Sequence, residues 1–88
     1  MSMPLLKCRY VEGMFSNEYI IQFKVAVPTS ESWMIVDKNE VIKLEGNEGL
    51  VKLIELQTVG NKCLVGLNDA GDRRISRRYV PKEEIVVQ

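Results

Sequence analysis

The chain has 88 residues, of which 45% are hydrophobic and 27% charged, values typical of one small globular domain spanning residues 1–88. Twelve basic residues balance twelve acidic ones, so no global charge draws the chain to nucleic acid or to an anionic membrane. No stretch approaches the ~18 apolar residues of a membrane span, and the N-terminus is too short and too weakly apolar for a signal peptide. Histidine, the commonest acid–base group and metal ligand, is absent.

In the first half, two segments have the pattern of strands. Every second residue of Tyr19–Val27 is apolar and most residues between them are polar, which is typical of a strand with one buried face. Trp33–Val36 predicts a second strand, apolar on both faces. Asp37 then suits the cap of a short helical turn, and Glu40 suits the third position of a capping box.

The second half shows the same kinds of signal. Leu50–Thr58 fits either a helix or a strand, and we predict a strand because Gly60 and Asn61 follow at the central positions of a type II′ hairpin turn. Cys63–Leu67 repeats the alternation of a half-buried strand. Pro81 suits the first position of a second short helical turn, where its missing N–H costs nothing.

Comparison of the sequence with itself at an offset of 44 residues aligns the two halves. Trp33–Ile42 lies over Arg77–Val86, and Tyr19–Phe23 lies over Cys63–Leu67 without a gap. The identical pairs in the first alignment are Val36/Val80, Lys38/Lys82 and Glu40/Glu84. The match predicts two similar halves, residues 5–44 and 49–88. Each would hold a hairpin, a third strand, and one helical turn before a short final strand.

Many short strands without a long helix predict an all-β fold, a small antiparallel β-barrel built from these two halves. The predicted strand, helical turn and short last strand within Tyr79–Val87 resemble the end of an SH3-like barrel. An open two-layer arrangement is the alternative.

Two groups of large apolar residues are candidates for a partner interface. Trp33, Met34 and Ile35 lie on a strand that is apolar on both faces, so one face must line the core and the other must be covered or exposed. Met14 and Phe15 lie in a predicted loop, where they either fold back as a lid on the core, which we favour, or reach a ligand. The favoured partner is a second copy of the chain, giving a homodimer, and another protein is the alternative.

The densest charge cluster is a candidate nucleic-acid site. Its residues are Arg73, Arg74, Arg77, Arg78, Tyr79 and Lys82. Arginines can grip phosphates and tyrosine can stack on a base. Alternatively, the arginines protect an exposed strand edge or pair with nearby acids. The window Asp72–Glu84 carries five basic and three acidic residues, a net charge of +2, so RNA or DNA binding is the second hypothesis.

Catalysis has little support in the sequence. The carboxylate pairs Glu83/Glu84 and Asp37/Glu40 lie where the start of a helical turn already explains them. There is no Ser–His or Cys–His constellation and no glycine-rich phosphate loop. We therefore expect a protein that is not an enzyme and has no catalytic residues.

The cysteines point to the compartment. Cys8 and Cys63 each lie in an apolar stretch, and a secreted domain of this size normally carries more cysteines. Two thiols without a signal peptide predict a cytoplasmic protein. Zinc needs paired ligands at short spacing, and the chain has neither a Cys-x-x-Cys pair nor a histidine. We expect no metal and no cofactor, and we expect the cysteines to fill the core rather than act as reactive thiols.

Two segments carry a resemblance to a known group of proteins. Gly13–Tyr19 reads Gly-Met-Phe-Ser-Asn-Glu-Tyr, and Ser32–Lys38 is an aromatic strand ending in Asp-Lys. This pattern resembles small uncharacterised bacterial proteins carried as integron gene cassettes. The resemblance implies a bacterial, mobile-gene origin and an accessory role, and it supplies no functional residues.

A second resemblance is local. Gly60–Ala70 and Lys82–Ile85 are similar to part of the carbon-storage-regulator family of dimeric RNA-binding β proteins. In that family the two segments are only a few residues apart, whereas Gly71–Pro81 separates them here. No RNA-binding residue is therefore carried over. The expected function is a small binding module that associates with itself, with nucleic-acid binding as the alternative.

Overall fold

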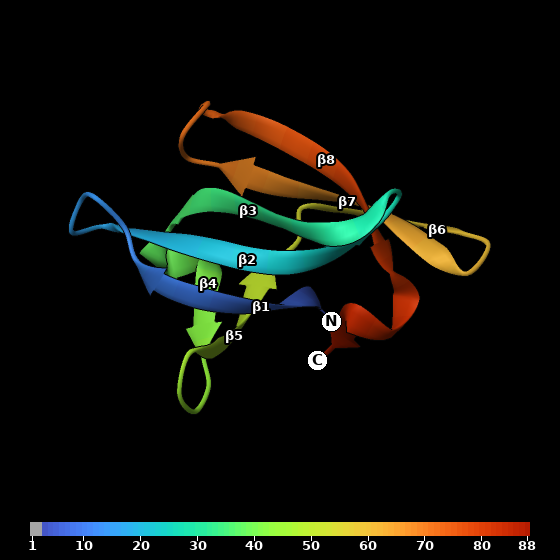
Figure 1. The fold of residues 1–88 in the computed structure, drawn as a ribbon, viewed down its shortest axis with the longest axis horizontal. Coiled ribbons are helices and arrows are strands. Elements are labelled where there is room, and N and C mark those ends of the chain that lie inside the picture. Colours follow the sequence, from blue (N-terminus) through green and yellow to red (C-terminus); the bar gives the residue numbers. More distant parts are fainter. Residues whose placement is uncertain (1–2) are drawn as a thin grey trace.

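Alternation of apolar and polar residues builds most of the chain into β-strands. The computed structural model describes residues 3–88. Its elements in chain order are β1 (Pro4–Glu12), β2 (Glu18–Ala26), β3 (Thr29–Asp37), the 3₁₀ turn η1 (Lys38–Glu40), β4 (Val41–Lys43), β5 (Glu48–Lys52), β6 (Glu55–Val59), β7 (Lys62–Asp69), β8 (Arg74–Pro81), the 3₁₀ turn η2 (Lys82–Glu84) and β9 (Ile85–Val87) (Figure 1). The prediction of an all-β fold is confirmed.

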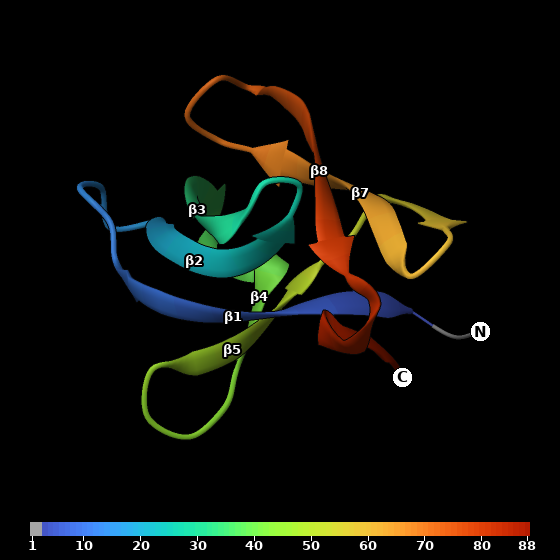
Figure 2. The same ribbon diagram turned by 45° about the vertical axis from the view of Figure 1, so that its right-hand side comes forward.

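The strands form two antiparallel sheets (Figure 2). In the larger sheet the order is β3-β2-β1-β5-β4, and β9 also pairs with β1. In the smaller sheet the order is β6-β7-β8. The strand ladders of the two sheets are not continuous, so closure into an SH3-like barrel stays a prediction.

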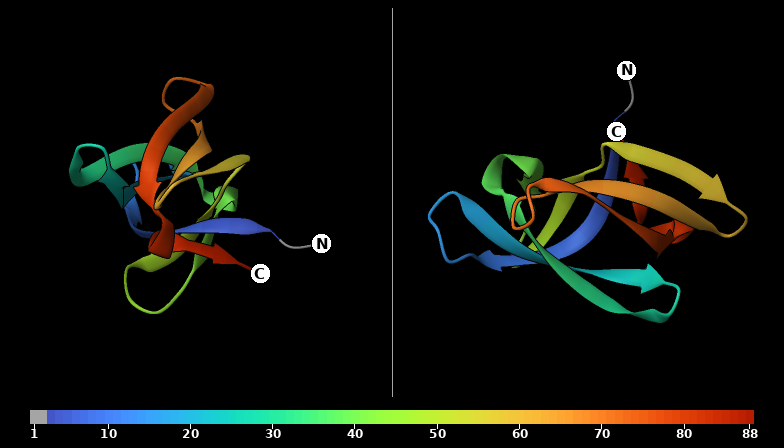
Figure 3. Two further views of the ribbon diagram at one scale, coloured as in Figure 1. Left: turned by 90° about the vertical axis from the view of Figure 1, so that its right-hand side faces the viewer. Right: turned by 90° about the horizontal axis from the view of Figure 1, so that it is seen from above.

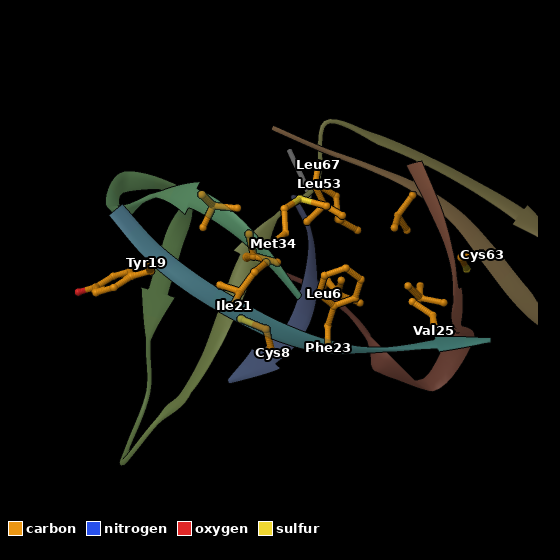
Figure 4. Packing of buried hydrophobic residues seen from close by; sticks show 14 residues of the cluster. Leu6, Cys8, Tyr19, Ile21, Phe23, Val25, Met34, Leu53, Cys63 and Leu67 are labelled. Carbon is orange, nitrogen blue, oxygen red and sulfur yellow. The ribbon is translucent and has the colours of Figure 1, made fainter. Parts of the chain in front are cut away.

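One core lies between the two sheets, where β2 contacts β8 and β3 contacts β7. Figure 4 shows Phe23 near the middle of this core, with Tyr19 toward one end and Cys63 toward the other. The predicted alternation is confirmed for Tyr19, Ile21, Phe23 and Val25, which are all buried. It is wrong for Val27, which lies in the turn after β2 and is 59% exposed. In β7 the same spacing buries Cys63, Val65 and Leu67.

Elements of the second half follow those of the first at the spacing of 44 residues. The turns η1 and η2 begin at Lys38 and Lys82, and β4 and β9 begin at Val41 and Ile85. The β2–β3 pairing of Glu18 with Asp37 has its counterpart at Lys62 with Pro81 in β7–β8. The last strand of each half pairs with the first strand of the other, β4 with β5 and β9 with β1. Both views of Figure 3 show β9 running alongside the start of β1.

The prediction of one strand over Leu50–Thr58 is wrong, because the chain changes sheets within it. β5 pairs with β1 and ends at Lys52, and β6 pairs with β7 and begins at Glu55. Between the two strands, the Leu53 N–H donates to the Pro4 carbonyl in the larger sheet, and the Ile54 N–H donates to Gly66 in the smaller one. The hairpin at Gly60 is where it was predicted, with φ of +64°.

The capping predictions are also wrong in detail. Asp37 is at the N-cap of η1, but its side chain makes no capping hydrogen bond. The carboxylate of Glu40 instead accepts a hydrogen bond from the Asn68 side chain at 2.7 Å. Pro81 is the last residue of β8 and the N-cap of η2, one position before the first helical residue. Each turn is only three residues long, a common length for a 3₁₀ helix, and neither has a side-chain cap. No helix in residues 3–88 has the length and apolar character to cross a bilayer.

Candidate functional site

The outer surface of β1, β2 and β3 carries apolar side chains that no other part of the fold fully covers. Val11, Ile20 and Ile35 are directly opposite one another across the three strands, so their side chains share one face. Trp33 follows on the same face of β3, opposite Gln22 in β2, and 66% of its surface is exposed. We call Val11, Ile20, Trp33 and Ile35 the β1–β3 face. Exposed apolar residues gathered in this way are typical of interaction surfaces.

Four of the five residues predicted as an interface have exposed surface. Met14 and Phe15 lie in the loop between β1 and β2 and are 89% and 62% exposed, so the prediction of a lid on the core is wrong. Met34 is only 4% exposed and belongs to the core, because its strand position points opposite to Trp33. Ile35 is half-buried, close to the position of Gly71 in the β7–β8 turn.

The strand that carries Trp33 is the edge of the larger sheet. The Ile35 carbonyl points away from β2 and accepts a hydrogen bond from the Ala70 N–H at 2.9 Å. Backbone groups alternate in direction along an antiparallel strand, so the N–H and C=O groups of Glu31 and Trp33 point the same way. Within residues 3–88, neither of these two residues has a backbone partner at this edge. The segment Thr29–Trp33 is therefore an open edge.

The corresponding edge of the smaller sheet, β8, is protected by charge. Arg74, Arg77 and Arg78 lie on this strand, whereas Glu31 is the one charged residue of Thr29–Trp33. The Arg78 guanidinium donates to the Arg77 carbonyl at 2.9 Å, which occupies one of the acceptors at this edge. Charged side chains of this kind discourage pairing with another strand.

One arginine of the predicted nucleic-acid cluster is held in an ion pair. Arg77 and Glu55 are both opposite Gly66, and the Arg77 guanidinium donates two hydrogen bonds to the Glu55 carboxylate at 2.7 and 3.1 Å. Gly66 leaves room for this pair, because a Cβ there would lie 2.9 Å from Glu55 Oε1. The hydrogen bond from Arg77 lowers the pKa of the Glu55 carboxyl, and Glu55 raises the pKa of Arg77.

The other residues of this cluster do not form one surface. Arg77 and Tyr79 lie on the outer face of β8 and Arg78 on the opposite face, as strand alternation requires. The ring of Tyr79 lies under the Lys62 ammonium at 5.6 Å, and Lys82 lies in η2. Arg73 and Arg74 are at the other end of the strand, beside the β7–β8 turn. Nucleic-acid binding stays a prediction, and these residues do not give it a single basic face.

Both cysteines lie in the hydrophobic core. Cys8 and Cys63 are free and buried. Burial, with a smaller effect of Glu48, raises the pKa of Cys8 to about 12, so its thiol stays protonated at neutral pH. In residues 3–88, no three acidic or cysteine side chains are grouped closely enough to hold a metal ion.

Sequence patterns missed the residues whose roles depend on strand register. Val11 belongs to the β1–β3 face and Glu55 pairs with Arg77, but neither is close in sequence to its partners. Ile20 did carry a signal, because it interrupts the polar side of the alternation in β2.

No protein-family model, curated protein or solved structure matches the chain. Both resemblances described from the sequence therefore stay predictions.

Proposed function

We propose that this protein is a non-enzymatic binding module that forms a homodimer through the open edge Thr29–Trp33 and the adjoining β1–β3 face. The observation that carries the proposal is Trp33, a residue 66% exposed on a strand edge with free backbone groups. An exposed tryptophan beside unpaired N–H and C=O groups combines two common sources of association, apolar burial and strand addition.

The edge is suited to a second copy of the same chain. Two copies of Thr29–Trp33 can pair antiparallel about a two-fold axis, with Glu31 and Trp33 of one copy exchanging backbone hydrogen bonds with those of the other. The chain has no net charge, so two copies do not repel one another globally. The equivalent edge, β8, carries three arginines and does not invite the same pairing.

Sedimentation equilibrium at micromolar concentration tests the dimer. We expect Trp33→Ser to weaken association at least about tenfold, because a tryptophan that becomes buried in an interface is a typical hot spot. Leu44→Ser is the matched control, since Leu44 is 49% exposed but lies between β4 and β5. A strict monomer at all concentrations, or equal loss in both variants, contradicts the proposal. Association with an extended peptide but not with itself would indicate another protein as partner.

A second pair of variants tests the edge itself. Glu31→Pro removes an N–H that points away from β2, and proline is tolerated at such positions on edge strands. It should block dimer formation and leave the monomer folded. Ser32→Pro, one residue later, removes an N–H that points toward β2 and should destabilise the monomer. If Glu31→Pro leaves the dimer intact, association does not use this edge.

We also infer that the two halves derive from one duplicated unit, which the equal spacing of strands and 3₁₀ turns supports. The free thiols of Cys8 and Cys63 support a cytoplasmic location for the protein.

A further inference from the structure

A polar cleft of about 550 Å³ lies where the two halves meet. The start of β2 and the end of β3 form one wall, and the β7–β8 turn with its flanking residues forms the other. The lining residues that carry the argument are Asn17, Glu18, Asp37, Asn68, Arg73 and Arg74. The volume is in the range of sites for small molecules.

Opposite charges face each other across this cleft. Glu18 and Asp37 belong to the first wall, and Arg73 and Arg74 to the second. Among residues 3–88, neither Glu18 nor Asp37 has a cationic partner within 4.0 Å, and Arg74 has only an exposed contact with Asp72 at 3.5 Å. The cleft thus presents two carboxylates and two guanidinium groups that do not satisfy one another.

The turn that carries the arginines is held in a defined shape. The Asp69 carboxylate accepts hydrogen bonds from the N–H groups of Gly71 and Asp72 and from the Ser76 hydroxyl. This third acid of the lining is therefore already used within the turn. Arg73 has φ of +55°, a left-handed conformation usually taken by glycine or asparagine. The turn itself does not favour arginine at this position.

A second cleft in the same molecule provides an internal comparison. It lies at the start of β7 and the end of β8, facing the β2–β3 hairpin, and six of its lining positions correspond to those of the first cleft at the offset of 44. These pairs are Asn17/Asn61, Glu18/Lys62, Asp37/Pro81, Asp69/Val25, Ala70/Ala26 and Arg73/Thr29. Proline and threonine replace Asp37 and Arg73 in the second cleft, so the architecture does not require charges at these positions.

From these observations we propose that the first cleft binds a small zwitterion of the amino-acid type. Its ammonium group contacts Glu18 and Asp37, and its carboxylate contacts Arg73 and Arg74. The side-chain amides of Asn17 and Asn68 lie in the same cleft and can donate or accept further hydrogen bonds. The site goes beyond dimer formation, because it lies outside the open edge Thr29–Trp33.

Backbone amide NMR titration tests the proposal with a series of ligands. The probes are glycine, γ-aminobutyrate and ε-aminocaproate, which increase the separation of the two charges, with acetate and methylammonium as ligands of one charge. At least one zwitterion should shift the amides of Asn17 and of residues 69–75 saturably. Acetate and methylammonium should bind at least about tenfold more weakly.

Variants then assign the effect to the arginines. Arg73→Gly/Arg74→Ser should weaken zwitterion binding at least about tenfold. Arg73→Gly alone should weaken it while keeping or raising the melting temperature, because glycine suits the positive φ. Lys24→Ser/Lys43→Ser, which also removes two cations but outside the cleft, should leave binding unchanged. The proposal is overturned if no probe gives saturable shifts at tens of millimolar, if acetate binds as tightly as every zwitterion, or if both double variants lose binding equally. None of these results depends on whether the dimer forms.

Discussion

Truncation of Phe23 should remove a large part of the stability of this protein. Phe23 is only 2% exposed and lies in the core between the two sheets (Figure 4). Phe→Ala at such a site costs about 3–5 kcal/mol, from lost transfer free energy and the cavity left behind. At about 0.05–0.15 kcal/mol per residue, a chain of 88 residues has roughly 4–13 kcal/mol in total. Since 1 kcal/mol shifts the melting temperature of a small domain by about 4–8 °C, we expect a fall of roughly 12–40 °C.

Thermal unfolding followed by circular dichroism measures this shift, and Phe15→Ala is the matched control. Phe15 is 62% exposed in the β1–β2 loop, so the same substitution there should change the stability by no more than about 0.5 kcal/mol. Equal shifts in the two variants would refute the assignment of Phe23 to the core.

Hydrogen exchange extends the same test to the second sheet. Phe23 belongs to β2, whereas Val65 and Leu67 enter the shared core from β7. If the two sheets share one core, Phe23→Ala should increase exchange of the β7 amides as much as that of the β2 amides. Full protection of Val65 and Leu67 in the variant would show that the smaller sheet is stable without the larger one.

Three further predictions concern single side chains. Gly66→Ala should cost about 1 kcal/mol in urea unfolding, because its Cβ would lie 3.0 Å from the Glu55 Cβ and 3.1 Å from Ile75 Cγ2, and Oε1 of Glu55, at 2.9 Å, would have to move away from Arg77. The pKa of Glu55 is lowered in the folded state, so its contribution to stability is complete above the ordinary pKa of 4.5 and is lost as the pH falls through the lowered value. The difference in urea midpoint between the wild type and Glu55→Gln should therefore be largest near neutral pH and vanish in acid. Cys8, with a pKa of about 12, should resist iodoacetamide at pH ~8 in the folded protein and react after unfolding, as mass spectrometry would show.

The strands could be predicted from the sequence because their side-chain pattern is local. The apolar positions from Tyr19 to Val25 all face the core, and the corresponding positions in Cys63–Leu67 do the same. A period of two reports which face is buried without any knowledge of the neighbouring strand. The glycine turn at Gly60 was predictable for the same reason, since its positive φ is a property of the residue itself.

The errors arose where a distant segment decides the local structure. Leu50–Thr58 breaks into two strands because the Leu53 and Ile54 N–H groups donate to acceptors in different sheets. Glu40 reaches Asn68 in β7 instead of capping its own turn. Both outcomes depend on how the two halves pack together, which no window of sequence contains.

The candidate site was only partly predictable for the same reason. Trp33 could be proposed from its apolar strand, but its position at an open edge follows from the sheet order. The arginines of β8 predict a nucleic-acid-binding surface, whereas the structure pairs Arg77 with Glu55 across Gly66. An ion pair across three strands requires the register of both ladders, and the sequence provides neither.

The pairing of each half with the other makes a further prediction, about chain connectivity. The two chain ends meet where Met3 and Gln88 exchange backbone hydrogen bonds of 2.7 and 3.2 Å, and β9 pairs with β1 as β4 pairs with β5. Consider a circular permutant that joins Gln88 to Met3 through a short glycine linker and opens the chain at Gly46. The new link connects β9 to β1, and the cut removes the equivalent link from β4 to β5. This permutant should keep the circular dichroism spectrum and cooperative unfolding of the parent.

A permutant opened at Gly60 is the control. This glycine has the same φ of +64° and equal free space around it, but the cut breaks the link between β6 and β7. All five residues of β6 are exposed, so this strand is held by its ladder with β7 and by the Glu55–Arg77 ion pair rather than by core packing. Without the turn, the β7 amides that pair with β6 should lose protection from exchange. Loss of structure on opening at Gly46, with none on opening at Gly60, would mean that the two junctions between halves are not equivalent.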